Sequence, residues 1–94
     1  MLKPLLITFH DMPPSAWVES AVRSGFEALL GATSDVVACH ADIRGQDRIA
    51  IGLSLPGGEL NVLAPLRKRA SPAALVRAVS ASFARPRRAL QRRR

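Results

Sequence analysis

The residues of this chain that are best suited to chemistry are arginines, and they gather at one end. Residues 66–94 hold ten of the fourteen Lys and Arg residues and none of the seven Asp and Glu residues. The formal net charge of +7 therefore comes from the C-terminal third. Guanidinium groups bind phosphate through paired N–H bonds, and a patch of one sign attracts a polyanion. The pattern indicates nucleic acid as the first class of partner and an anionic membrane surface as the second.

Other side chains with catalytic or ligand chemistry are few and scattered. His10 and His40 fall in alternating segments with no partner set nearby, and Cys39 is a lone thiol on the inward side of its segment. The chain has no spacing typical of a zinc site, a dinucleotide site or a phosphate-binding loop. No pair of carboxylates is placed for acid–base work. We therefore expect no enzyme activity, no metal, no cofactor and no small-molecule substrate.

Length and composition limit the class of protein to which this chain can belong. A chain of 94 residues fits one domain over residues 1–94, and we expect about its last five to eight residues to fray. The hydrophobic content of 48% is typical of a globular chain. No apolar run approaches the roughly 18 residues of a membrane span, and the first segment is too short for a signal peptide. The single cysteine excludes an intrachain disulfide, which is typical of a protein in the reducing cytoplasm. Together with the lack of a long apolar run, this leads us to expect a cytoplasmic protein with no membrane partner.

Apolar periodicity predicts the elements that must position the arginines. Alternation predicts strands, and apolar residues three to four apart predict helices. In chain order these are a strand at 4–10, a helix at about 15–30, strands at 34–43, 48–55 and 59–64, and a helix from residue 72. The last three strands form an antiparallel meander through short turns. The order βαβββα predicts an α+β two-layer sandwich, a four-stranded sheet with two helices packed on one face.

Individual residues mark the limits and inward faces of these elements. Ser15 fits the N-cap of the first helix, and Gly31 fits its C-cap. Ser71 fits the N-cap of the second helix and is followed by proline at the first helical position. In the second strand, alternation places Val37 on the inward face and Val36 on the outward face.

The second helix carries an apolar stripe and a basic stripe on opposite sides. The apolar stripe consists of Leu75, Val79, Phe83, Pro86 and Leu90. The basic stripe consists of Arg77, Arg85, Arg88 and Arg92. At 100° per residue, each set falls within an arc of about 80°. Proline removes a helix hydrogen bond, so we expect a regular helix to about residue 84, followed by a kink or a break.

We predict that the basic surface binds RNA. The RNA-binding residues predicted from the charge pattern are Arg67, Lys68, Arg69, Arg77, Arg85, Arg88 and Arg92. No aromatic residue is interleaved with the basic stripe, because Phe83 belongs to the apolar stripe, so base stacking is not expected. Contacts to the backbone and shape of structured RNA are the better fit.

Three segments resemble a known family, the ribosome hibernation-promoting factors, also called sigma-54 modulation or ribosome-associated inhibitor proteins. The segments are LLITFHDMPPSAWVESAV at 5–22, LSLPGGELNV at 53–62 and AVSASFARPRRAL at 78–90. They resemble the family's opening strand and helix entry, its PGGEL hairpin, and its second helix. The resemblance covers nearly the whole chain and implies the same βαβββα fold.

The resemblance also implies a function. Members of this family bind the small ribosomal subunit in the channel used by mRNA and tRNA, and inhibit translation in stationary phase or stress. Arg87 and Arg88 match the basic pair of the family's second helix. The resemblance therefore adds Arg87, and Arg23 as the sole basic residue of the first helix, to the predicted RNA-binding residues. This chain departs from the pattern in its short segment at 44–47, in Pro86, and in the few basic residues of its first helix. It resembles the family's short form, which lacks the C-terminal dimerisation domain of the long form. The resemblance therefore implies a monomer or a weak dimer.

Two other functions remain open. The same fold could serve as a general module for structured RNA or DNA, held by phosphate contacts alone. It could also serve as a protein–protein regulatory module whose basic helix docks on an acidic partner. The first alternative predicts equal affinity for ribosomes and for arbitrary RNA. The second predicts a partner that survives nuclease treatment.

Overall fold

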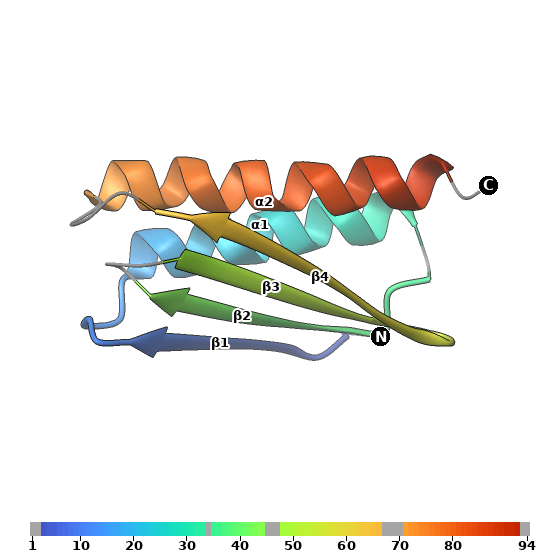
Figure 1. Ribbon diagram of the computed structural model, residues 1–94, viewed down its shortest axis with the longest axis horizontal. Coiled ribbons are helices and arrows are strands. Elements are labelled where there is room, and N and C mark those ends of the chain that lie inside the picture. Colours follow the sequence, from blue (N-terminus) through green and yellow to red (C-terminus); the bar gives the residue numbers. More distant parts are fainter. Residues whose placement is uncertain (1–2, 34, 45–47, 67–70, 93–94) are drawn as a thin grey trace.

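The computed structural model describes residues 3–33, 35–44, 48–66 and 71–92, with the backbone alone described at positions 72, 87 and 89–92. The elements are β1 (Leu5–His10), α1 (Ala16–Ala32), β2 (Ala38–Arg44), β3 (Arg48–Leu55), β4 (Gly58–Pro65) and α2 (Pro72–Arg92). Their order confirms the predicted βαβββα arrangement (Figure 1).

The sheet is mixed, with spatial order β1-β2-β3-β4. β2, β3 and β4 form the predicted antiparallel meander, whereas β1 runs parallel to β2. Parallel neighbours need a crossover, and α1 supplies it. Between β3 and β4 the chain turns at Pro56 and Gly57, where Gly57 has a φ of 106°. Proline followed by a residue of positive φ is typical of a type II turn, which fixes the register of this hairpin.

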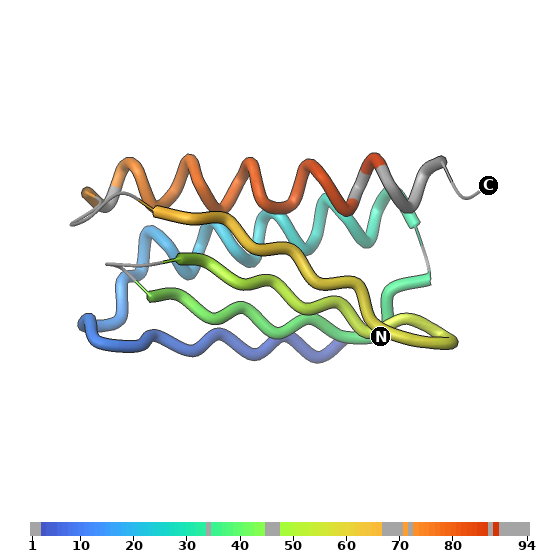
Figure 2. Tube along the Cα trace, in the orientation of Figure 1, coloured from blue at the N-terminus to red at the C-terminus, as the bar shows by residue number. Residues whose placement is uncertain are grey.

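Both helices cover one face of the sheet and leave the other face open (Figure 2). They lie side by side and run in the same direction, with the first turn of α2 beside the first turn of α1 (Figure 1). The buried apolar side chains come from α1, α2, the strands β2 and β3, and Val36 in the segment before β2, whereas the apolar residues of β4 are only partly buried. The buried side chains are Val18, Val22, Phe26, Leu29, Val36, Cys39, Ala41, Ile43, Ile49, Ile51, Leu53, Leu75, Val79 and Phe83. This core confirms the inward positions predicted for Leu75, Val79 and Phe83 of the second helix.

The first helix begins as predicted and ends later. The Ser15 hydroxyl accepts a hydrogen bond from the Val18 backbone N–H at 3.4 Å, which confirms its place as the N-cap. The prediction of Gly31 as the C-cap is wrong, because α1 continues through Ala32 and is capped by Thr33. Thr33 is extended, and its backbone N–H donates to the Leu29 carbonyl at 3.0 Å. The cap residue itself is therefore not left-handed, and Gly31 is not needed to end the helix.

The segment before β2 reverses the predicted inward residue. Val36 is fully buried, whereas Val37 is 51% exposed. Regular alternation begins only with the strand at Ala38, so the period of two does not extend back to residue 37. The Val37 backbone N–H donates to the Ser54 carbonyl at 2.8 Å, which holds the segment against the end of β3.

The predicted break at Pro86 does not occur, and α2 continues to Arg92. The proline cannot donate to the Ser82 carbonyl, and such a position costs a helix about 3 kcal/mol. The Pro86 side chain is, however, fully buried on the apolar stripe, and α2 packs on β3 and β4. Burial of the proline ring and of Phe83 one turn earlier offsets the lost hydrogen bond, so tertiary packing outweighs helix propensity here.

Two glycines of α1 give opposite predictions for the same substitution. A Cβ at Gly25 would lie 2.5 Å and 2.8 Å from two ring atoms of Phe83, whereas a Cβ at Gly31 meets nothing within 4 Å. Gly25→Ala should destabilise the protein by about 1–3 kcal/mol through overpacking. Gly31→Ala should stabilise it by about 0.5–1 kcal/mol through helix propensity. Urea unfolding of both variants checks the pair, and equal stabilisation would contradict the close contact of α1 and α2 at Phe83.

Candidate nucleic-acid interface

The second helix turns its arginines outward because its opposite side is held in the core. The Ser71 hydroxyl accepts from the Ala74 backbone N–H at 3.2 Å, which confirms the predicted N-cap. Leu75, Val79, Phe83 and Pro86 are buried on the side that faces the sheet. The opposite side carries Arg77, Arg85 and Arg88, and all three side chains are exposed. At 1.5 Å per residue these three arginines span about 16 Å along the helix axis.

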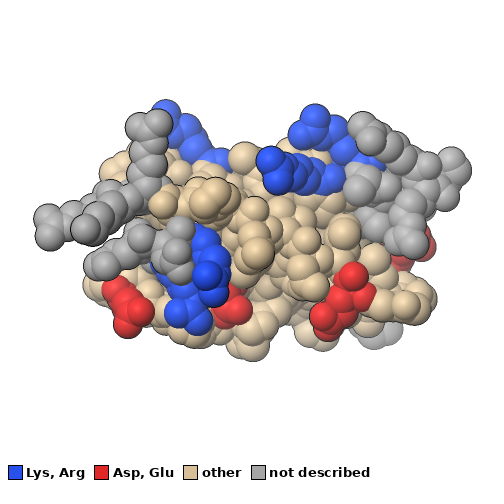
Figure 3. Space-filling model, in the orientation of Figure 1, with Lys and Arg blue, Asp and Glu red and all other residues tan. Residues whose placement is uncertain are grey.

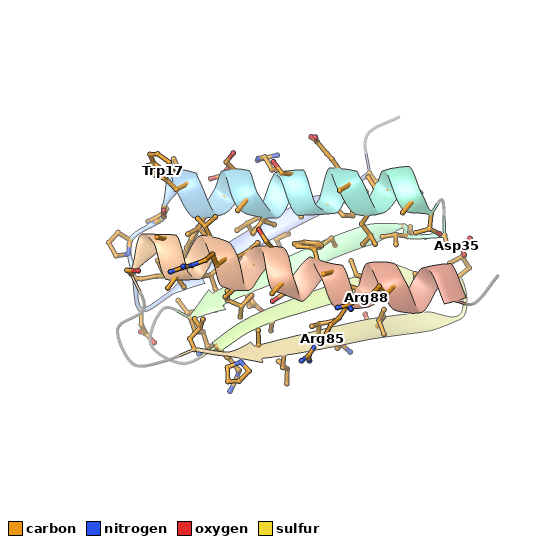
Figure 4. All side chains as sticks on the ribbon, turned by 90° about the horizontal axis from the view of Figure 1, so that it is seen from above. Trp17, Asp35, Arg85 and Arg88 are labelled. Carbon is orange, nitrogen blue, oxygen red and sulfur yellow. The ribbon has the colours of Figure 1, made fainter. Side chains whose placement is uncertain are left out.

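Basic side chains lie over α2 in the space-filling view, with little acidic surface near them (Figure 3). Figure 4 shows Arg85 and Arg88 close together on the side of α2 that faces away from α1. Arg85 lines a small groove of about 120 Å³ between α2 and β4. The Arg88 Nε donates to the Ala84 carbonyl at 3.4 Å, so this side chain lies back along its own helix. Both arginines are thus positioned by α2, and Arg85 also borders β4.

The basic residues predicted on α2 and just before it include two groups whose side chains are outside the described part of the chain. Arg87 and Arg92 lie within α2, but only their backbone belongs to the described part of the chain. Arg67, Lys68 and Arg69 fall between β4 and α2, outside the described residues. Their assignment to the interface stays a prediction.

Arg23 is the only predicted site residue on α1, and an acid partly neutralises it. Its guanidinium lies 3.0 Å from the Glu19 carboxylate, one helical turn earlier. Both side chains are exposed to solvent, and such a pair contributes only about 0.3–0.5 kcal/mol. A phosphate could replace Glu19 at small cost. Arg23 nevertheless adds less positive potential than the arginines of α2.

Sequence reasoning missed Trp17 as a surface feature. Its side chain is 78% exposed in the first turn of α1. It lines a hollow whose other lining residues come from α1 and α2. Figure 4 shows its side chain at the start of α1. Trp17 directly precedes Val18, the first residue of the buried stripe of α1. One residue advances about 100° around the helix axis, so Trp17 lies off the buried stripe. Counting these steps along the sequence could have placed Trp17 at the surface.

The prediction that the histidines lack partners is wrong. The His10 Nε2 and the His40 Nε2 lie 3.1 Å and 3.2 Å from the same atom, Asp42 Oδ1. The Thr8 Oγ lies 3.3 Å from the His40 Nε2. These residues meet on the open face of the sheet because β1 pairs with β2, which puts Thr8 beside Asp42. Alternation within one strand cannot reveal the pairing of two strands.

This cluster lacks the geometry of a hydroxyl–imidazole–carboxylate relay. Such a relay needs one ring nitrogen on the hydroxyl and the other on the carboxylate. Here Thr8 and Asp42 both contact the same nitrogen of His40. Within residues 3–33, 35–44, 48–66 and 71–92, no group of three or more His, Cys, Asp or Glu residues is arranged to hold a metal ion. The hydrogen bonds join β1 to β2 at the surface.

Cys39 lies in the core, as its inward position predicted. Burial raises the pKa of the Cys39 thiol from 9.0 to about 12. At neutral pH the thiol is therefore protonated and is a poor nucleophile. Thiol-modifying reagents at about pH 8 should react with it slowly in the folded protein and rapidly in denaturant.

The raised pKa of Cys39 also gives a direction for stability at high pH. The unfolded chain loses this proton near pH 9, whereas the folded chain keeps it until about pH 12. The buried, protonated thiol therefore contributes to the free energy of unfolding in full below pH 9, and this contribution is lost as the pH rises toward 12. A Cys39→Ala variant should show a smaller loss of stability over this interval in urea unfolding. An equal loss would contradict burial of the thiol.

No helix in the described part of the chain is both long and apolar enough to cross a membrane. No protein-family model matches the sequence, and no curated protein matches it either.

Several solved structures resemble this chain, and two examples cover nearly its whole length. The first is a ribosomal subunit interface protein from Coxiella burnetii, with a TM-score of 0.75 and 12% identity over 95% of this chain and 94% of that one. The second is the N-terminal domain of Protein Y from Thermus thermophilus, with a TM-score of 0.68 and 20% identity over 100% of both chains. The agreement along each chain confirms the fold that the three sequence segments implied.

Proposed function

We propose that this protein is a cytoplasmic factor that binds the small ribosomal subunit through ribosomal RNA and inhibits translation in stationary phase or stress. The observation that carries the proposal is the exposed arginine face of α2, formed by Arg77, Arg85 and Arg88 on a helix without an acid. Guanidinium groups on such a face pair with backbone phosphates. The fold supports the choice of the ribosome, because one similar protein is named for a ribosomal subunit interface.

The geometry suits binding to structured RNA by its backbone. Three arginines spread over about 16 Å of one helix can reach several phosphates of a folded RNA. The sequence segments that resemble the hibernation factors imply a site in the channel used by mRNA and tRNA. A folded domain seated there excludes both ligands, which is sufficient for inhibition. No catalytic step is required.

Sedimentation with isolated small ribosomal subunits tests the proposal. The purified protein is mixed with subunits across a salt series, with excess transfer RNA as competitor. Co-sedimentation at about 0.15 M salt that survives the competitor is the expected result, because a dedicated site adds contacts beyond counterion release. Failure to co-sediment even at low salt would overturn the proposal. Inhibition itself is measured as reduced output of a reconstituted translation reaction.

A general nucleic-acid module is the second candidate, and the phosphate chemistry of the α2 face favours it. Arginine contacts to phosphates do not depend on sequence. This candidate predicts that binding to subunits falls steeply with salt and is displaced by transfer RNA or by arbitrary duplex RNA. The sedimentation experiment separates the two candidates directly. A partner that persists in pull-downs after nuclease treatment would favour the protein–protein module instead.

A further inference from the structure

Trp17 stands apart from the other exposed hydrophobic side chains. Among the described residues, the large exposed ones are Leu6, Trp17, Val37 and Leu63, and Trp17 is the most exposed at 78%. Leu6 and Leu63 belong to the strands β1 and β4, and Val37 directly precedes β2. Trp17 alone projects from the helical layer, which is the layer that carries the arginines of α2.

A hollow between the helices adjoins the indole ring. It has a volume of about 400 Å³ and lies between the N-terminal halves of α1 and α2. Its lining consists of Ala16, Trp17, Ser20, Ala21, Ser24 and Val76. All of these residues are uncharged, and Trp17 is the one large side chain among them. Arg77 follows Val76 directly and is exposed on α2, so a cation stands at the same end of the helix pair.

The partner that fits this end of the molecule must be anionic and must offer a flat apolar face. The α2 segment contains no acid, and its exposed arginines repel a cationic partner. RNA has the charge, but a base inside a duplex hides its faces in the stack. An unpaired base exposes them and stacks well on an aromatic side chain. A single-stranded or bulged nucleotide combines both properties.

We propose that Trp17 stacks on an unpaired nucleobase of the RNA that lies along α2, with Arg77 on an adjacent phosphate. The inference rests on the proposed function and adds the kind of RNA feature that is recognised. It also replaces the expectation that this surface lacks an aromatic residue, because the stacking ring comes from α1 and not from the basic helix. Serine hydroxyls in the hollow, from Ser20 and Ser24, can donate to the ribose or phosphate of the same nucleotide.

Besides RNA, an anionic membrane also combines negative charge with an apolar contact. Stable insertion needs several apolar side chains on one face of a helix. Here Leu75, Val79, Phe83 and Pro86 of α2 are buried, and Trp17 is the one large exposed hydrophobic side chain in the described helical layer. The structure therefore favours RNA, and the membrane becomes an outcome of the test.

Fluorescence gives a direct readout, because the chain has one tryptophan and no tyrosine. The protein is titrated with a single-stranded RNA oligonucleotide, a duplex of the same phosphate count, and an abasic oligonucleotide of the same charge. We expect strong quenching of the indole emission by the single strand. We expect binding with little quenching by the duplex and the abasic strand. Equal changes with all three probes, or no change with any, would overturn the inference.

Substitutions at Trp17 provide the second arm, measured as affinity for isolated small subunits. Trp17→Ala should weaken binding roughly 5- to 150-fold, which is the usual effect of removing one stacked base. Trp17→Phe should retain most of the affinity, because it keeps an aromatic face. Both variants should keep the wild-type melting temperature, since the indole is exposed. Equal losses in Phe and Ala variants would contradict stacking.

The outcomes separate this inference from the proposed function. If the wild-type protein does not bind subunits, the proposed function fails. The stacking inference alone fails under a different pair of results. In that case the wild-type protein and Trp17→Ala bind subunits equally well, and single-stranded RNA does not quench the wild-type indole emission. Vesicles of phosphatidylcholine and phosphatidylserine form the last arm. A blue shift of the emission with vesicles, together with no quenching by RNA, would overturn the inference in favour of a membrane contact.

Discussion

Reversal of Arg85 and Arg88 together to Glu should reduce affinity for the small ribosomal subunit roughly 100- to 10,000-fold. Each arginine is expected to make a charge-assisted contact with phosphate that contributes about 1.5–3 kcal/mol. A carboxylate at the same place repels the phosphate as well. Both side chains are exposed and point away from the buried stripe of α2, so the fold should be unaffected. Sedimentation measures the affinity, and circular dichroism of the melting transition checks the fold.

A matched control reverses two arginines on the other layer. Arg44 of β2 and Arg48 of β3 are register partners at one end of the sheet. The double change to Glu at these positions alters the net charge by the same amount as the change on α2. If the α2 face makes the contacts, the control variant should lose less than about tenfold, through long-range steering alone. Equal losses in the two variants would contradict a local interface on α2.

The salt dependence of binding distinguishes lost contacts from lost steering. Each phosphate contact with single-stranded or duplex nucleic acid contributes about 0.7–0.9 to the slope of log affinity against log salt concentration. The change of Arg85 and Arg88 should therefore lower this slope by about 1.4–1.8. The change of Arg44 and Arg48 should leave it nearly constant. An unchanged slope after reversal of Arg85 and Arg88 would mean that neither residue contacts a phosphate.

Local periodicity was sufficient to predict the order of the elements and most of the core. Val18, Val22 and Leu29 lie at helical spacing, and Ile49 and Ile51 alternate, so each set reveals its buried face without reference to any other segment. The errors at Val37 and Pro86 come from interactions between segments, whereas the end of α1 was misplaced by two residues within one helix. Burial on the sheet keeps α2 helical through Pro86, against its propensity.

In the candidate site, too, the features set by one element could be predicted, whereas those that depend on two elements could not. The outward positions of Arg77, Arg85 and Arg88 follow from counting 100° steps along one helix, and the structure places all three at the surface. The contact of His10 with Asp42 depends on the parallel pairing of β1 with β2. The hollow beside Trp17 depends on how two helices lie together. Neither can be read from a single element, because both need the relative placement of segments far apart in the chain.

Phe83→Ala should destabilise the protein by about 3–5 kcal/mol, the usual effect of removing a large aromatic side chain from a core. The Phe83 side chain is 4% exposed, and its ring lies directly over Gly25 of α1. The deletion leaves a cavity at the contact of the two helices. A domain of this size has a total stability of about 5–15 kcal/mol, so the loss is a large share of it. Urea unfolding measures the change, and Phe83→Leu serves as the milder variant, with a smaller loss.

The pairing of Phe83 with Gly25 allows a sharper version of this test. In a wild-type background, Gly25→Ala should destabilise the protein because the new methyl group overlaps the ring. In the Phe83→Ala background, the same change should be neutral or stabilising, because the ring is gone and alanine favours the helix. The two substitutions should therefore be strongly non-additive. Additive effects, or an unchanged melting temperature in Phe83→Ala, would mean that α2 is rotated about its axis. The arginines on its opposite side would then turn with it, so this stability measurement also tests the position of the proposed RNA-binding face.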